Sequence, residues 1–229
     1  MEKRSSSSCS DQQGSVGTGA SANRSRYRIH YTKKGNVCFI GHRDLIRAAE
    51  RMIRRARLPI ALSEGFHPKP RISYLSVLPL GFASEDEVLD LVLTENIEEQ
   101  DLLDRLNAVR VEGIDFLKVD LLAPEEAKKQ PGAFVYRMAL PDRDPSAIRN
   151  AIQAFLDSDS FSVAKSNGKI VDARIPVRDL SLNDENILSM DLAVQKGPEA
   201  GVKEILTVLQ LENELFRSIF PVRTKSLFL

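Results

Sequence analysis

The chain has 229 residues, of which 42% are hydrophobic and 28% are charged, and its 32 basic residues balance its 32 acidic residues. This composition is typical of a soluble globular protein with its own core, and it argues against a disordered chain or a small domain that depends on disulfides. With two cysteines, no apolar run long enough to span a membrane and no apolar leader, the sequence predicts a cytoplasmic protein.

The charges are distributed unevenly along the chain. Residues 1–72 contain 15 Lys and Arg against 5 Asp and Glu, whereas residues 73–122 contain 3 against 12. This asymmetry favours either a cationic face for an anionic partner or two faces that neutralise each other inside the fold. The acidic run Glu85, Asp86 and Glu87 is predicted to solubilise a loop.

The first part of the chain shows alternating strand and helix patterns. Residues 1–25, rich in serine and glycine, are predicted to form a disordered tail. Alternation in residues 26–32 then predicts a strand, and apolar residues at helical spacing predict a helix from His42 to Arg57. Two further strands, a helix capped by Asn96 and a closing strand complete the order strand, helix, strand, strand, helix, strand.

A linker at residues 123–132 is followed by the same order of elements. This part contains a helix capped by Asp144, a hairpin whose turn is Asn167-Gly168, a long helix in GVKEILTVLQL and a terminal strand. The segment RDLSLNDEN does not fit the plain pattern and indicates a decoration or a strand exchange. Two βαββαβ units predict an α+β fold of two tandem ferredoxin-like domains, each an antiparallel sheet with both helices on one face. These domains are expected at residues 26–122 and 133–229.

The predicted first helix carries arginines on the side opposite its apolar stripe. Arginine presents a planar fork to phosphates and stacks on bases, so this side of the helix predicts RNA binding. The alternative is a merely solvated face, with Glu50 pairing with Arg54 and the other arginines meeting acidic residues elsewhere in the fold. The candidate RNA contacts are Arg47, Arg51, Arg54 and Arg55, and the alternative acidic partners are Asp86, Glu87 and Asp90.

The segment GFHPKPRIS follows this helix. Its two prolines restrict the backbone, so the loop is predicted to be stiff and to present His67, Lys69 and Arg71 to a nucleic acid with little loss of entropy. The flanking aromatic residues Phe66 and Tyr74 are candidates for stacking on bases. The alternative is a lead into an edge strand, with Phe66 buried as an anchor.

His42 and Asp44 open the helix and are candidate acid/base residues, because a histidine at a helix N-terminus tends to stay neutral. A capping histidine is the simpler interpretation, and no metal-ligand spacing joins His42 or His67 to Cys38. The sequence has no known motif for nucleotide binding or for a catalytic nucleophile. We therefore predict no cofactor, no metal and no catalytic residue.

The C-terminal segment offers a second basic contact. Arg223 and Lys225 are separated by one residue in a predicted strand, so both side chains are expected on the same face. Arg223 is therefore a further candidate for RNA binding, and the alternative is a solvated face.

The segment from Phe39 to Leu93 resembles the signature region of a bacterial domain of unknown function associated with radical SAM proteins. Members of the family that it resembles have the pattern F-x-S-H-x-D-L before the helix, G-F-N-P-H-P-[KR]-[IL]-S after it and then a P-L-P-L-G-like turn. Gly41, His67 and Lys69 depart from the pattern. The matching residues are His42, Asp44, Leu45, Gly65, Phe66, Pro68, Pro70, Arg71, Ser73 and Gly81.

The resemblance implies a stand-alone accessory chain beside a radical SAM protein that acts in trans, in a genetic context of ribosomal proteins and a ribonuclease. The chain lacks a CxxxCxxC motif, so it does not itself bind the iron–sulfur cluster of such an enzyme. The leading hypothesis is therefore a non-catalytic protein that binds tRNA or ribosomal RNA, or presents a substrate, for RNA modification or translation. The alternatives are a nuclease-like enzyme that uses His42 or His67, and a protein-interaction module whose basic face docks on an acidic partner.

Overall fold

The computed structural model describes residues 24–126, 129–194, 200–217 and 219–228. Nearly all of the tail predicted at residues 1–25 thus lies outside the described residues. Within the described part of the chain, no helix has both the length and the apolar character needed to cross a membrane.

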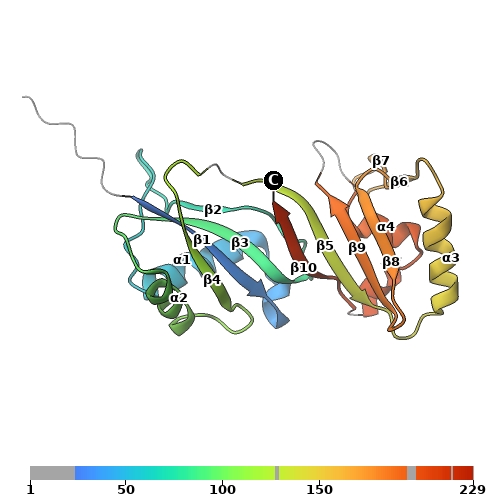
Figure 1. Cartoon of the computed structure of the whole chain (residues 1–229), viewed down its shortest axis with the longest axis horizontal. Helices are drawn as coiled ribbons and strands as arrows, with labels where there is room; N and C mark the ends of the chain where they lie inside the picture. The colour runs from blue at the N-terminus through green and yellow to red at the C-terminus, as the bar shows by residue number, and fades with distance from the viewer. Residues whose placement is uncertain (1–23, 127–128, 195–199, 218, 229) are drawn as a thin grey trace, which may run out of the picture.

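The first half of the chain follows the predicted order of strands and helices (Figure 1). One short 3-10 helix, η1, is added after the first strand, and the second strand is much shorter than the apolar run ISYLSVLPLGF predicts. The elements are β1 (Ser25–Lys33), η1 (Gly35–Phe39), α1 (His42–Arg55), β2 (Ile72–Tyr74), β3 (Ala83–Leu93), α2 (Glu99–Ala108) and β4 (Phe116–Leu122).

The second half repeats the order with one inserted hairpin, β6–β7. The segment predicted to be a decoration, RDLSLNDEN, supplies most of β8, because Leu180 and Leu182 alternate with polar residues as in a strand with one buried face. The predicted long last helix, GVKEILTVLQL, is the shorter α4, and a 3-10 helix, η2, follows it. The elements are β5 (Pro131–Ala139), α3 (Pro145–Leu156), β6 (Ser162–Ala164), β7 (Ile170–Asp172), β8 (Val177–Leu182), β9 (Ile187–Ala193), α4 (Val202–Val208), η2 (Glu212–Arg217) and β10 (Val222–Phe228).

One sheet runs through both halves, which confirms an α+β fold with a mostly antiparallel sheet. Its strand order is β4-β1-β3-β10-β5-β9-β8, and β2 pairs with β3 beside this path. The last strand, β10, lies in the middle of the molecule (Figure 1), pairing antiparallel with β5 and parallel with β3. The hairpin β6–β7 forms a separate two-stranded sheet, with its turn at Gly168 as predicted.

Each half has its own hydrophobic core under its helices. In the first half, Tyr27 and Ile29 of β1 pack with α1 and α2, so both helices cover one face of the sheet. The alternate residues of β1 lie on the opposite face, which we call the open face; they are Arg26, Arg28 and His30. In the second half, α3 and α4 cover a core that includes Tyr136 of β5.

A buried arginine joins the two halves. Arg223 of β10 is 1% exposed. Its guanidinium donates to Glu87 of β3 at 2.9 Å, to the Ser76 hydroxyl at 2.7 Å and to the Tyr136 hydroxyl of β5 at 2.9 Å. It also lies over the ring of Phe134, 3.9 Å from the centroid. The Arg223 guanidinium is thus enclosed by groups of the protein itself.

Arg223 is therefore not a surface contact, and the predicted shared face with Lys225 is wrong. The pairing register with β5 shifts between Arg223 and Lys225. This irregularity breaks the alternation of side chains along the strand, so Arg223 is buried whereas Lys225 is exposed.

Asp86 of β3 links this strand to β1 and β10 on the open face. Its carboxylate accepts from the Ser226 backbone N–H at 2.8 Å and lies 3.1 Å from His30 Nδ1. Burial by itself raises the pKa of Asp86, but the hydrogen bonds from His30 and Ser226 and the charges of His30 and Arg223 outweigh it and lower the pKa below the ordinary 3.8. The acidic run is thus part of a strand, and its prediction as a solubilising loop is wrong.

We expect Asp86→Asn to remove a stabilisation that depends on pH. Because the folded-state pKa is lower than the unfolded one, the carboxylate stabilises the fold above about pH 4, and this contribution is lost as the pH falls through the folded-state pKa. Urea unfolding at pH 6 should show the variant less stable than the wild type, and the difference should shrink towards about pH 2. A stability difference that does not change with pH would contradict this role. An equal loss of stability in Asp142→Asn, at the exposed Asp142, would also contradict it.

Candidate functional site

Helix α1 presents a row of arginines to the solvent. Its apolar residues, including Leu45, Met52 and Ile53, are buried against the sheet. The side chains on the opposite side of the helix are exposed, as the sequence predicts for an amphipathic helix. The exposed arginines are Arg43, Arg47, Arg51, Arg54 and Arg55, and Arg57 follows just after the helix.

The acidic residues proposed as alternative partners are occupied elsewhere. Asp90 pairs with Arg28 through two hydrogen bonds of 2.9 and 3.0 Å, and Glu87 and Asp86 bind Arg223 and His30 as described above. Within the described residues, the α1 arginines form one ion pair, from Arg47 to Asp44 at 3.2 Å, and the predicted pair of Glu50 with Arg54 is absent. The alternative in which Asp86, Glu87 and Asp90 neutralise the arginines of α1 is therefore wrong.

The loop after α1 is closed on itself and exposes its tip. Ser63 N–H donates to the Lys69 carbonyl at 2.8 Å, and Lys69 N–H donates to the Ser63 hydroxyl at 3.0 Å. Gly65 adopts a φ of +115°, which favours glycine. Phe66 is 102% exposed, and its predicted alternative role as a buried anchor is therefore wrong. His67 and Lys69 are exposed as well.

After the last turn of α1, the chain runs to the C-terminal end of β3, and the loop lies there. Ile60 pairs with Leu93, and Ala61 N–H donates to the Val92 carbonyl at 2.8 Å. Arg71 closes the loop on the other side, where its N–H donates to the Ala61 carbonyl at 2.8 Å. The C-terminal arginines of α1 and the exposed loop are thus connected by only a few residues.

Tyr74 is turned towards the core rather than towards the solvent. Its ring contacts His42 edge to face, with centroids 5.3 Å apart. Burial, with a smaller effect of Glu50, raises the pKa of Tyr74 well above its usual range, and its buried hydroxyl has no hydrogen-bond partner in the described residues. Tyr74 is therefore not a surface residue for base stacking.

The candidate acid/base residues at the start of α1 make other contacts: Asp44 pairs with Arg47, and His42 packs on Tyr74. Gly41 caps α1, so the prediction that His42 is the capping residue is wrong; His42 is the first residue of the helix and packs on Tyr74. His67 lies in the loop that follows the C-terminal end of α1. Among the described residues, no group of three or more potential ligands is placed to hold a metal ion.

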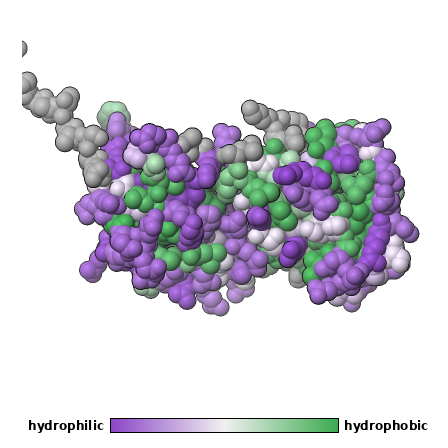
Figure 2. All heavy atoms as spheres, viewed as in Figure 1, coloured by the Kyte–Doolittle hydropathy of each residue, from purple (hydrophilic) through white to green (hydrophobic). Residues whose placement is uncertain are grey.

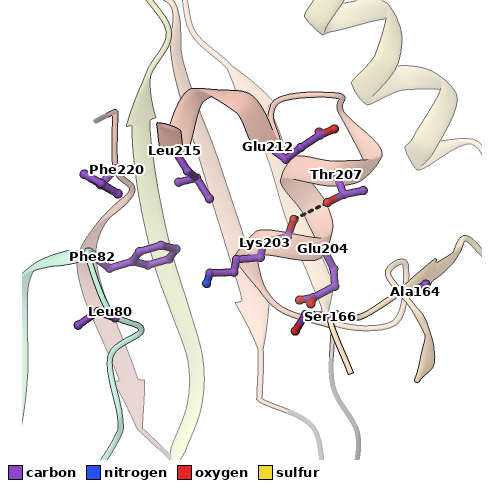
Figure 3. A pocket seen from close by; sticks show the side chains of 10 residues that line it. All are labelled: Leu80, Phe82, Ala164, Ser166, Lys203, Glu204, Thr207, Glu212, Leu215 and Phe220. Carbon is purple, nitrogen blue, oxygen red and sulfur yellow. Dashed lines mark hydrogen bonds between the residues drawn. The ribbon is translucent and has the colours of Figure 1, made fainter. Parts of the chain in front are cut away.

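A cleft of about 490 Å³ lies where the two halves meet (Figure 3). One wall is apolar, with Phe82 and Phe220, and the other is formed by α4 and η2. Figure 3 shows the Lys203 ammonium directed towards the apolar wall. The lining residues come from three separate parts of the chain, residues 80–82, 164–166 and 203–220, so no local sequence pattern indicates this cleft.

The surface separates into differently composed regions. Figure 2 shows that hydrophilic residues predominate over the visible face of the first half, whereas hydrophobic residues gather in the seam between β8 and α3. The exposed arginines and the loop belong to the first half.

Comparison with known proteins adds a family but no activity. A family described as "uncharacterized protein conserved in bacteria (DUF2344)" matches residues 26–203. No curated protein matches the sequence significantly. Among solved structures, the crystal structure of a putative glycine cleavage system transcriptional repressor aligns with 90% of this chain and 98% of its own, at 8% identity and a TM-score of 0.21. A likeness this distant carries no argument about fold or function.

Proposed function

The chain belongs to the family of uncharacterised proteins conserved in bacteria, DUF2344, and we propose that it is an accessory protein that binds RNA through its first half. One observation carries this proposal: the arginines of α1 are exposed and are followed by a loop with exposed Phe66, His67 and Lys69, whereas Asp90 and Glu87 pair with Arg28 and Arg223 instead. Several arginines near one aromatic side chain are the groups that bind phosphates and stack on unpaired bases.

We further propose that this chain presents its RNA to a radical SAM enzyme that acts in trans. The resemblance of residues 39–93 to a domain associated with radical SAM proteins supports this part of the proposal.

The test is the salt dependence of RNA binding, measured by fluorescence anisotropy with labelled tRNA and ribosomal RNA fragments at about 50 and about 200 mM salt. We expect the wild type to bind and to lose affinity steeply with salt. Arg51→Gln/Arg54→Gln/Arg55→Gln should reduce the slope of log K against log salt by about 2 to 3, because each neutralised phosphate contributes about 0.7 to 0.9.

A matched control removes three positive charges from the second half, with Lys169→Gln/Arg178→Gln/Lys203→Gln. These residues are exposed, and the control should leave the slope close to that of the wild type. If both triple variants lower affinity equally, binding follows net charge and the assignment to α1 is wrong. If the wild type binds no RNA but is captured by an acidic protein surface through α1, the helix is a protein-docking face instead.

A further inference from the structure

The open face of the first half contains a hollow lined by two arginines. It lies over β1, β2 and β3, next to the end of the exposed loop, and has a volume of about 400 Å³. Arg26 comes from β1, Arg71 from the end of the loop and Ser73 from β2. Because Ile72 pairs with Leu91 of the core-facing row, Arg71 and Ser73 lie on the opposite, open side of the strand.

The one carboxylate in this hollow is already neutralised. Both oxygens of Asp90 accept hydrogen bonds from Arg28, whose remaining nitrogen pairs with Glu126 at 3.3 Å. Arg28 and Asp90 are each 5% exposed, so the pair is a buried and fixed part of the sheet surface. The charges of Arg26 and Arg71 therefore remain uncompensated by Asp90.

Arg26 and Arg71 are only partly used by the protein. Arg71 donates to the Leu62 carbonyl at 3.2 Å, and its nearest carboxylate is that of Glu64, an exposed side chain, at 3.6 Å. Arg26 donates to the Glu126 carbonyl, but its buried Nε–H has no partner in the described residues. A buried donor without an acceptor costs free energy, and a bound anion is one way to satisfy it.

The arrangement fits a tetrahedral oxyanion. The two guanidinium groups are positively charged N–H donors, the kind of group that phosphate oxygens accept from, and the Ser73 hydroxyl is a further donor at the rim. The hollow is partly shielded from water by the sheet, which strengthens each charge interaction relative to an exposed arginine.

We propose that the hollow between Arg26 and Arg71 holds one phosphate group of the RNA. This phosphate would lie next to the end of the exposed loop, where β2 begins. This inference rests on the proposed function and deepens it, because it places an anchoring phosphate on the open face while α1 supplies more diffuse contacts. It also assigns a role to the arginine that ends the proline-containing loop: Arg71 connects the loop tip, where Phe66 is exposed, to the phosphate.

The test compares two probes on the full chain: inorganic phosphate, followed by isothermal titration calorimetry, and a single-stranded RNA oligonucleotide, followed by anisotropy. Arg26→Gln and Arg71→Gln should each lower RNA affinity about tenfold, which is the loss expected for one charge-assisted hydrogen-bonding group, and reduce the salt slope by about 1. Phosphate should compete with the RNA in the wild type, and this competition should be lost in the double variant. Arg71→Lys keeps the charge but loses the fork, so it should give an intermediate affinity.

The outcomes separate this site from RNA binding as a whole. Arg26→Gln leaves the hydrogen bonds of the loop unchanged, so its effect is not attributable to loop unfolding; the melting temperature of each variant checks this. If both variants bind RNA as the wild type does while the α1 variant does not, the phosphate site is wrong and the proposed function stands. If the wild type binds phosphate but no RNA, the hollow takes a free small phosphate, and both the RNA assignment and the proposed function are wrong.

Discussion

Replacing Arg223 by methionine is expected to lower the free energy of unfolding by about 3–5 kcal/mol, the range measured when one partner of a buried ion pair is removed. The loss arises mainly from the group left behind, since Glu87 is 3% exposed and burial already raises its pKa despite the Arg223 charge. The Ser76 and Tyr136 hydroxyls also lose their donor. Because these partners belong to both halves, the variant loosens the junction at β10.

Urea unfolding at neutral pH measures this effect, with Arg137→Met as the control. Arg137 is an exposed arginine in the neighbouring strand β5, so the control should change stability by no more than about 0.5 kcal/mol. Arg223→Met/Glu87→Leu, which replaces both charges by apolar groups, should recover part of the loss. A single variant as stable as the control would show that the junction does not depend on Arg223.

Gly113→Ala is expected to destabilise the first half by about 2–4 kcal/mol. Gly113 adopts a φ of +87°, and a Cβ at this position would lie 2.2 Å from the Lys34 carbonyl oxygen and 2.8 Å from a Val37 methyl group. The backbone would have to move, which breaks the 2.8 Å hydrogen bond from Lys34 N–H to the Gly113 carbonyl. This contact holds the α2–β4 connection against the end of β1.

Gly168→Ala is the matched control for backbone strain alone. Gly168 has a φ of +79° in the β6–β7 turn, and nothing lies within 4 Å of a Cβ built there. Its substitution should therefore cost only the conformational term of about 1–2 kcal/mol. Equal losses in the two variants, measured by thermal unfolding, would rule out the close approach of Gly113 to Lys34 as a source of stability.

Elements specified by local chemistry could be predicted from the sequence. Asp144 caps α3 by accepting from Ser146 N–H at 3.0 Å, with Pro145 as the first helical residue. The terminal strand and the turn at Gly168 follow equally local patterns. Where tertiary contacts compete, the prediction fails: Glu98 caps α2, because the Asn96 side chain accepts from the buried Tyr27 hydroxyl instead.

The candidate site could be predicted only in its continuous part. The exposed arginines of α1 and the loop tip follow from helical spacing and proline positions. The partners of the acidic residues could not be predicted, because Asp90 meets Arg28 across strands 62 residues apart and Glu87 meets Arg223 136 residues away. Arg26 likewise resembles any strand residue until the fold places it beside Arg71.

Photo-cross-linking of the full chain to RNA that contains 4-thiouridine, with peptides identified by mass spectrometry, tests the central claim most directly. RNA bound to the first half should cross-link to the loop at residues 63–71, with Phe66 as the principal stacking residue, and to the exposed side of α1. Cross-links confined to the second half, or to the cleft lined by Phe82 and Phe220, would contradict this account of where and how the protein binds RNA.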